Sequence, residues 1–220
     1  MIEDWIAWFP ELLDGLQISL TVALASIVLG LVLGTLVALA SVSGHRPVRW
    51  LSVALVEVLR GVPALVLIYL VYFGLPGVGL TLEAWTAAVL AIGVNTAAYM
   101  GEIIRAGLLH LPPGQSEAAQ SLGLTRLQEL RAVVLPQALR TVFPSLVSYS
   151  VIVFQATSLC YLIGVRELLS VGFSIGSVTF EYLSVLTLVG LIYVVVSIAG
   201  SRLAHAVEAR SKQKTSIPRS

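Results

Sequence analysis

Long apolar runs dominate the sequence, and short polar stretches separate them. Five runs of about 20 residues are long enough to cross a hydrocarbon core of roughly 30 Å as helices. They lie at about 16–40, 51–73, 84–104, 139–163 and 183–203. Because these runs do not alternate between apolar and polar residues, they predict membrane helices rather than the strands of a membrane barrel. The pattern therefore predicts an all-α fold with five transmembrane helices, in which residues 1–220 form a single transmembrane domain.

Composition and charge narrow the class further. The chain is 57% hydrophobic and only 11% charged, which is far from the balance of a soluble domain. A net charge of +1 gives no reason to expect a nucleic-acid partner. One cysteine excludes an internal disulfide, and the three histidines lack the spacing of metal ligands, so we expect no metal site. The acidic start "MIEDWIAWFPELLDG" is unlike a cleavable signal peptide, so we expect the first span to direct its own insertion.

Lysine and arginine are distributed unequally between the two sets of loops. One set, between spans one and two, between spans three and four, and after span five, contains most of the 13 basic residues. The opposite loops contain only Arg166, and Arg60 lies within the second span. Because basic loops stay in the cytoplasm, this bias predicts an N-terminus outside the cell and a C-terminus in the cytoplasm.

The loop between the third and fourth spans contains a polar, amphipathic stretch, "EAAQSLGLTRLQELRAVVLPQ". We predict a short helix at 117–122 and a joint at Gly123, where glycine permits an unusual dihedral. Thr125 and Gln128 fit a capping box that opens a second helix. Pro136 is expected to end that helix before the fourth span begins, because proline lacks an amide donor.

Two interpretations of this loop differ in what covers it. An amphipathic helix can lie on lipid headgroups, but the first helix here is weakly hydrophobic and lacks the lysine-rich face that such anchors favour. A soluble protein partner fits the composition better. The chain has no GxxxxGK[ST] phosphate-binding loop, so any ATP hydrolysis must come from another subunit.

The spacing of this stretch resembles a known family. "EAA", three residues, Gly123, nine residues and then "VVLP" are similar to the cytoplasmic coupling loop of ABC importer permeases. The segments "LVEVLRGVPALVLIYLVYFGLP" (55–76) and "AAVLAIGVNTAAYMGEIIRAGLLHLPPGQSEAAQSLGL" (87–124) resemble the polar amino-acid branch of that family, and the similarity extends over nearly the whole chain.

This resemblance implies a type I importer permease with a coupling loop at about 112–136. The residues expected to couple the chain to a separate ATPase are Glu117, Ala118, Ala119, Gly123, Leu124 and Pro136. The implied role is that of a transport subunit with no catalytic residues and no cofactor of its own, since ATP and Mg would be bound by the partner ATPase.

The resemblance also implies the remaining partners and the location. These are a second permease subunit, identical or homologous, an extracytoplasmic solute-binding protein, and the lipid of a bacterial inner membrane. Solute would pass by alternating access. The alternative is a stand-alone secondary transporter or channel, which five spans without a detectable internal repeat disfavour.

Polar residues inside the spans are candidates for the solute pathway, because ionisable groups in a membrane are costly and face a cavity or a partner. The candidates are Glu57, Arg60, Asn95, Tyr99, Gln155, Thr157 and Ser158. Structural roles are open alternatives: Glu57 and Arg60 can pair at i,i+3, and Asn95 can join helices. Gly61 and Pro63 predict a break in the second span after Arg60. Glu102 and Arg105 repeat the i,i+3 spacing and are expected to form a structural pair, and Gly30 and Gly34 to pack helices.

The stretch "FQATSL" (154–159) departs from related amino-acid permeases, which commonly have Leu-Lys-Asp-Thr-Ser-Leu. Gln155 and Ala156 stand at the lysine and aspartate positions. Ala156 supplies no acceptor for a buried cation, which would be costly to leave unpaired. The resemblance implies a small polar solute, most simply an amino acid or its derivative, and this departure weakens the expectation of a cationic or ordinary amino acid. The sequence leaves open which solute it is, and whether this subunit or a partner permease binds it.

Overall fold

The computed structural model describes residues 2–215, and every regular element in that range is helical. Four long apolar helices can cross a membrane: Glu3–Ser41, Ala84–Leu109, Arg126–Ile163 and Tyr182–Leu203. A fifth span is possible only as a bent pair, Arg46–Gly61 followed by Ala64–Val78, whose halves meet at 99°. The predicted all-α fold is confirmed, and the break expected in the second span is present.

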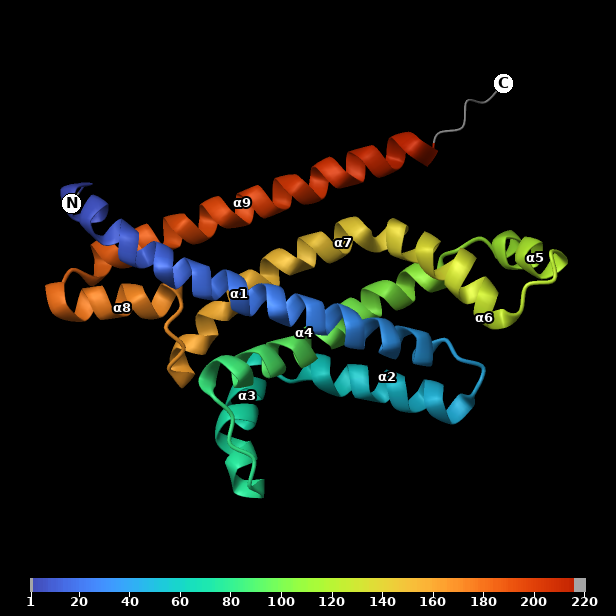
Figure 1. The fold of residues 1–220 in the computed structure, drawn as a ribbon, viewed down its shortest axis with the longest axis horizontal. Helices are drawn as coiled ribbons and strands as arrows, with labels where there is room; N and C mark the ends of the chain where they lie inside the picture. The colour runs from blue at the N-terminus through green and yellow to red at the C-terminus, as the bar shows by residue number, and fades with distance from the viewer. Residues whose placement is uncertain (1, 216–220) are drawn as a thin grey trace.

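The elements follow one another as α1 (Ile2–Ser41), α2 (Arg46–Gly61), α3 (Ala64–Tyr69), a π-helical turn (Leu70–Gly74) and a 3-10 turn (Leu75–Val78), α4 (Ala84–Leu109), α5 (Pro113–Ser121), α6 (Arg126–Glu129), a π-helical turn (Leu130–Val134), α7 (Leu135–Ala156), a 3-10 helix (Thr157–Ile163), α8 (Leu168–Thr179) and α9 (Tyr182–Thr215). Figure 1 shows the α1–α2 loop and the α5–α6 segment at one end of the molecule and α8 at the other, with α3 turned away from α2.

Helices α1 and α4 form the centre of the bundle, and glycine allows their close approach. A Cβ atom at Gly34 would lie 2.8 Å from the carbonyl oxygen of Ala97 and 2.9 Å from the amide nitrogen of Gly101. Such distances are shorter than a real side chain tolerates, so glycine brings the two backbones into contact. A Cβ atom at Gly30 would lie 2.7 Å from the Cβ of Thr96, so this position also leaves no room for a side chain. The predicted packing role of these two glycines is confirmed.

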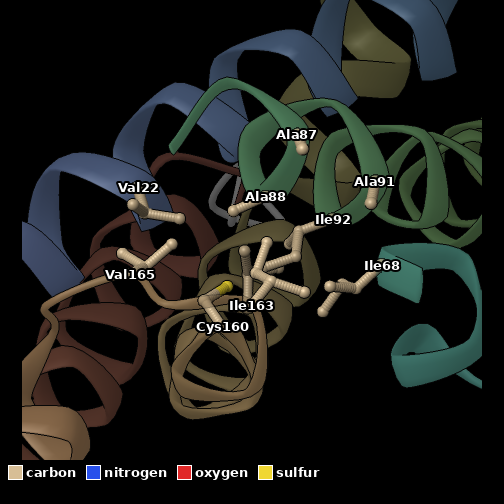
Figure 2. Packing of buried hydrophobic residues seen from close by; sticks show 10 residues of the cluster. Val22, Ile68, Ala87, Ala88, Ala91, Ile92, Cys160, Ile163 and Val165 are labelled. Atoms are coloured by element: carbon tan, nitrogen blue, oxygen red, sulfur yellow. The ribbon is translucent and has the colours of Figure 1, made fainter. Parts of the chain in front are cut away.

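One cluster of buried apolar side chains joins the broken second span to the bundle (Figure 2). Ile68 of α3 packs with Ile92 of α4 and Ile163 of the 3-10 helix. Val22 of α1 and the buried Cys160 belong to the same cluster. Packing of α3 in this cluster fixes the bent half of the span against the bundle, because van der Waals contact holds helices together in a membrane.

The prediction that Pro136 ends a helix is wrong. Helical structure continues from α6 through the π-helical turn into α7, and Pro136 lies in the first turn of α7. In the π-helical turn the amide of Leu135 donates to the carbonyl of Leu130, five residues back. This i,i+5 bond changes the hydrogen-bond register just before the proline, so the missing donor of Pro136 falls at a helix start, where it is tolerated.

Candidate transport site and coupling loop

The break in the second span exposes two main-chain carbonyls that a continuous helix would satisfy. In an α-helix, the carbonyl of Leu59 would accept from the amide of residue 63, but Pro63 has no amide hydrogen. Asn95 of α4 supplies the donor instead, with its Nδ2 3.3 Å from the Leu59 oxygen. Tyr99, one turn further along α4, donates its hydroxyl to the carbonyl of Arg60 at 3.3 Å. Polar side chains of one span thus stabilise the broken end of another.

A cavity of about 420 Å³ lies at this break. Its walls come from the α2–α3 joint, from α4 and from α7, and they include Arg60, Asn95, Thr96, Tyr99, Tyr149 and Ala156. The volume falls in the range of about 300–1,000 Å³ that is typical of small-molecule sites. Apolar walls with a few convergent polar groups are also typical of such sites. Three predicted pathway residues, Arg60, Asn95 and Tyr99, therefore share one cavity. Tyr149, a polar residue of the fourth span, lies on the same wall.

Arg60 is only loosely paired. Its Nη1 lies 3.9 Å from Oε1 of Glu57, which is too long for a hydrogen bond. The guanidinium carbon lies 5.4 Å from the centre of the Tyr99 ring, a cation–π distance. The Tyr99 ring stacks in turn on Tyr149, with 5.3 Å between centroids. Arg60 Nε is buried and has no hydrogen-bond partner. The aromatic pair fixes the guanidinium, and one of its charged donors remains free.

The second Glu–Arg pair is closed. Arg105 Nε donates to Oε2 of Glu102 at 2.8 Å, and Arg105 Nη2 donates to Oε1 at 2.6 Å. This two-bond geometry satisfies both groups and is the strongest arrangement that arginine and a carboxylate form. The prediction that Glu102 and Arg105 form a structural pair is confirmed.

The other predicted pathway residues do not line this cavity. Gln155 and Ser158 line a separate hollow of about 390 Å³ between α7 and α9, where Gln155 Nε2 donates to Ser197 Oγ at 3.1 Å. Thr157 is fully buried, and its hydroxyl donates to the carbonyl of Phe154 at 2.7 Å. The structure therefore separates this polar stripe from Arg60 and Asn95, and the role of the stripe in transport stays a prediction.

The coupling loop contains the joint that the sequence predicted. Helix α5 begins at Pro113, four residues before the predicted start at Glu117, and ends at Ser121. Gly123 has φ +75°, and its amide donates to the carbonyl of Gln120, while the amide of Leu124 donates to the carbonyl of Ala119. This pair of bonds is the Schellman motif, which requires a left-handed residue at its centre. The positive φ explains why glycine occupies position 123.

The capping box at the start of α6 is also confirmed. The amide of Gln128 donates to Thr125 Oγ1 at 3.4 Å, and the amide of Thr125 donates to Gln128 Oε1 at 2.9 Å. Within α5, Glu117, Ala118 and Gln120 are exposed and Ala119 is buried, and Leu122, directly after the helix, is exposed. The exposed face of α5 is therefore available to a partner, and its other face is held by the loop.

Glu129 holds α5 against α6, a role that the sequence analysis missed. Its carboxylate is buried and accepts hydrogen bonds from Ser116 Oγ and from Gln120 Nε2, both on α5. A second polar contact, from Gln137 Nε2 to Gln115 Oε1 at 3.0 Å, connects α5 to α7. Glutamates are common on exposed loop helices, so no pattern in the sequence distinguishes this buried one.

A second missed carboxylate lies at the opposite end of the molecule. Glu167 is fully buried and caps α8 by accepting from the amides of Leu169 and Ser170, at 2.9 and 2.8 Å. It also accepts from the hydroxyls of Tyr193, at 3.0 Å, and Ser19, at 3.3 Å. Burial raises the pKa of the Glu167 carboxyl, and these four donors oppose that rise. The carboxylate joins α1, α8 and α9.

The fold agrees with that of known proteins. Residues 18–213 match the family described as the inner membrane component of binding-protein-dependent transport systems. The chain belongs to this family. Its membership confirms the predicted resemblance and the predicted role as a transport subunit that works with a separate ATPase and not as an enzyme.

Several characterised permeases are similar to this one along nearly their whole length. The arginine transport system permease protein ArtQ of Bacillus subtilis is 34% identical over 94% of this chain and 95% of its own. The glutamine transport system permease protein GlnP of Escherichia coli is 34% identical, covering 95% and 98%. The glutamate/aspartate import permease protein GltK of Escherichia coli is 32% identical, covering 94% and 98%.

Solved structures show the same fold. A crystal structure of an amino acid ABC transporter with histidines superposes with a TM-score of 0.87, at 32% identity, covering 96% of this chain and 98% of the other. The MetNI methionine ABC transporter, in an inward-facing conformation, gives a TM-score of 0.73 at 22% identity, covering 94% and 99%. The second likeness shows the fold alone.

Proposed function

We propose that this permease imports an amino acid or an amino-acid derivative, and that the solute passes through the cavity at the break in the second span. The observation that carries this proposal is the convergence of Arg60, Asn95 and Tyr99 on one cavity at an interrupted helix. Interrupted spans with polar groups are typical places for solute binding in membrane transporters. The relatives named for arginine, glutamine and glutamate/aspartate support the solute class.

The transporter assembles from this permease, a second identical or homologous permease, an ATPase that binds ATP and Mg, and an extracytoplasmic binding protein. Glu117, Ala118, Ala119, Gly123, Leu124 and Pro136 form or support the surface on which the ATPase acts. Helix α5 is suited to this task because Glu129 and the Gln115–Gln137 contact fix it to α6 and α7. A partner that moves α5 therefore moves the fourth span with it, as alternating access requires.

A matched pair of glycines tests the coupling. Gly114 and Gly123 both have open space at the Cβ position, but only Gly123 has a positive φ. A β-branched residue in the left-handed region is strained by about 1–2 kcal/mol. We therefore expect Gly123→Val to reduce ATP-driven uptake several-fold at normal membrane abundance, and Gly114→Val to leave uptake near wild type. Equal uptake in the two variants would show that the joint does not transmit the movement of the ATPase.

Orientation is proposed with the N-terminus outside and the C-terminus in the cytoplasm of a bacterial inner-membrane protein. In a Cys160→Ser background, a cysteine at Val78, on the tip after α3, should react with an impermeant maleimide added to spheroplasts. A cysteine at His45, in the α1–α2 loop, should react only after permeabilisation. The reverse pattern would invert the topology.

The hollow between α7 and α9, which Gln155 and Ser158 line, is tested separately. Gln155→Ala removes the bond to Ser197. Reduced uptake of the native solute at equal expression would assign Gln155, and with it the hollow that it shares with Ser158, to the pathway. Unchanged uptake would leave the stripe as packing between α7 and α9.

A further inference from the structure

The described wall of the cavity at the broken span carries a positive charge and no negative one. Among the described residues that line it, Arg60 is the only charged one, and no aspartate or glutamate is present. Glu57, the nearest partner, does not line the cavity, and its side chain is 70% exposed. Ala156, on the α7 wall, contributes only a methyl group. A solute in this cavity therefore meets a cation on the wall, while the carboxylate nearest to that cation lies outside the lining.

Two of the donors near Arg60 already have acceptors, whereas Arg60 Nε has none. Asn95 Nδ2 donates to the carbonyl of Leu59, and the Tyr99 hydroxyl donates to the carbonyl of Arg60. Arg60 Nε is buried without an acceptor. A charged donor that is buried and unpaired is costly, so an acceptor supplied from the cavity would be favoured.

A carboxylate is the acceptor that fits this donor set. A guanidinium presents parallel N–H groups that match the two oxygens of a carboxylate, and such two-bond contacts are about twice as strong as neutral ones. The ring of Tyr99 beneath the guanidinium holds it in place before the solute arrives. Less free energy is then lost in ordering the side chain when the solute binds.

We propose that Arg60 binds the carboxylate of the transported solute, and that the cavity of this subunit consequently selects neutral and acidic amino acids against cationic ones. This inference rests on the proposed function, because it assigns the solute class of the same cavity. A cationic amino acid could place its carboxylate on Arg60, but its second positive charge would lie near the guanidinium with no carboxylate on the cavity wall to compensate.

The test uses the complete transporter, with its partner subunits but without the binding protein, in lipid nanodiscs. Equilibrium binding is measured with radiolabelled L-glutamine, L-glutamate and L-arginine, and with the carboxamide analogue of the probe that binds most tightly. We expect L-arginine and the carboxamide to bind at least about tenfold more weakly than that probe, as the loss of a charge-assisted contact implies.

Arg60→Gln is expected to abolish the preference for the carboxylate over the carboxamide, because neither analogue then meets a cation. Arg60→Lys should restore part of this preference, since it keeps the charge but not the planar fork. Arg105→Gln is the matched control, because Arg105 is bonded to Glu102 and does not line the cavity. It should leave the ratio of the two affinities unchanged.

Ala156→Asp provides a second variant that does not remove Arg60. An aspartate on the same wall would neutralise the guanidinium and supply an acceptor for a cationic solute. We expect the variant to lose affinity for L-glutamate and to gain affinity for L-arginine.

Three outcomes would overturn these assignments, and they are distinguishable. If none of the three amino acids binds the wild-type transporter, the proposed function of the cavity fails and the inference fails with it. If an amino acid binds but the carboxylate preference persists in Arg60→Gln, the solute cavity stands and the role of Arg60 is wrong. If L-arginine binds the wild-type transporter as tightly as L-glutamine, the selectivity is wrong.

Discussion

Two Glu–Arg pairs with the same i,i+3 spacing lie on neighbouring helices, and they differ in geometry. Glu102 and Arg105 on α4 make two hydrogen bonds, at 2.8 and 2.6 Å. Glu57 and Arg60 on α2 remain 3.9 Å apart. Helix α4 continues to Leu109, beyond its pair, whereas α2 ends at Gly61, directly after Arg60. The end of the helix places Arg60 at a cavity, and its guanidinium packs on an aromatic ring instead of on its own glutamate.

This comparison shows that the spacing of a charged pair predicts proximity but not function. In α4 every neighbouring backbone group is satisfied within the helix, so the pair closes on itself. In α2 the break leaves carbonyls that Asn95 and Tyr99 must satisfy, and these residues bring α4 to the free guanidinium. The polar groups collect where the helix is interrupted, as expected when backbone groups in a membrane need internal partners.

Of the two Glu–Arg pairs, the one with two hydrogen bonds should show the larger effect when it is broken. Glu102→Ala leaves Arg105 without its carboxylate, and hydrogen bonds to charged groups contribute about 1.5–3 kcal/mol. We expect the unfolding temperature of the purified transporter in detergent to fall by several degrees. Glu57→Ala removes a long, exposed contact, so its effect should be close to zero. Equal shifts in a thermal-unfolding assay would contradict the difference between the two pairs.

A smaller effect is expected from Asn95→Leu, and a double-mutant cycle can assign its cause. The variant leaves the carbonyl of Leu59 without a donor and should destabilise the fold by about 1–3 kcal/mol. In a Pro63→Ala background, the new amide at position 63 can donate to that carbonyl, so Asn95→Leu should be less costly there. Thermal unfolding of the four proteins measures the coupling. Strictly additive shifts would show that Asn95 does not compensate for the proline.

The smallest effect should follow from Tyr99→Phe. This change removes only the hydroxyl that donates to the carbonyl of Arg60, and the ring remains under the guanidinium and against Tyr149. A single neutral hydrogen bond contributes about 0.5–1.5 kcal/mol. Solute affinity should therefore change less in Tyr99→Phe than in Tyr99→Leu, which also removes the ring. If the two variants lose the same affinity, the ring does not position Arg60.

A fourth prediction compares Glu167 with an exposed acidic residue, because the contribution of a carboxylate to stability depends on its hydrogen-bond partners. Glu167→Ala leaves two amides and two hydroxyls without an acceptor, whereas Glu181→Ala removes a solvated side chain. Loss of a helix cap alone costs about 0.5–2 kcal/mol. We expect a lower unfolding temperature for Glu167→Ala only. An unchanged value would mean that α8 holds its position by apolar packing.

Much of this molecule follows from local sequence signals. The apolar runs, the Gly-Val-Pro break, the glycine at position 123 and the Thr125–Gln128 capping box each depend on a few neighbouring residues, and each is present as predicted. The family spacing around "EAA" is also local. Such features are predictable because helix starts, stops and lengths are decided within one or two turns.

Only the tertiary structure decided which polar residues share a site. Local signals also fail in places. Proline at position 136 predicted the end of a helix, but a π-helical turn just before it keeps the helix continuous. The sequence grouped Gln155 of α7 with Asn95 of α4 in one polar pathway, but the two lie in different hollows. Ala156, next to Gln155, lies on the wall with Asn95, because neighbouring positions of a helix face different sides. Glu129 and Glu167 look like surface carboxylates in the sequence. Glu129 is buried against the neighbouring helix α5, and Glu167 is buried with Ser19 of α1 and Tyr193 of α9. A side chain's partners across helices depend on how the helices cross, and no short stretch of sequence contains that information.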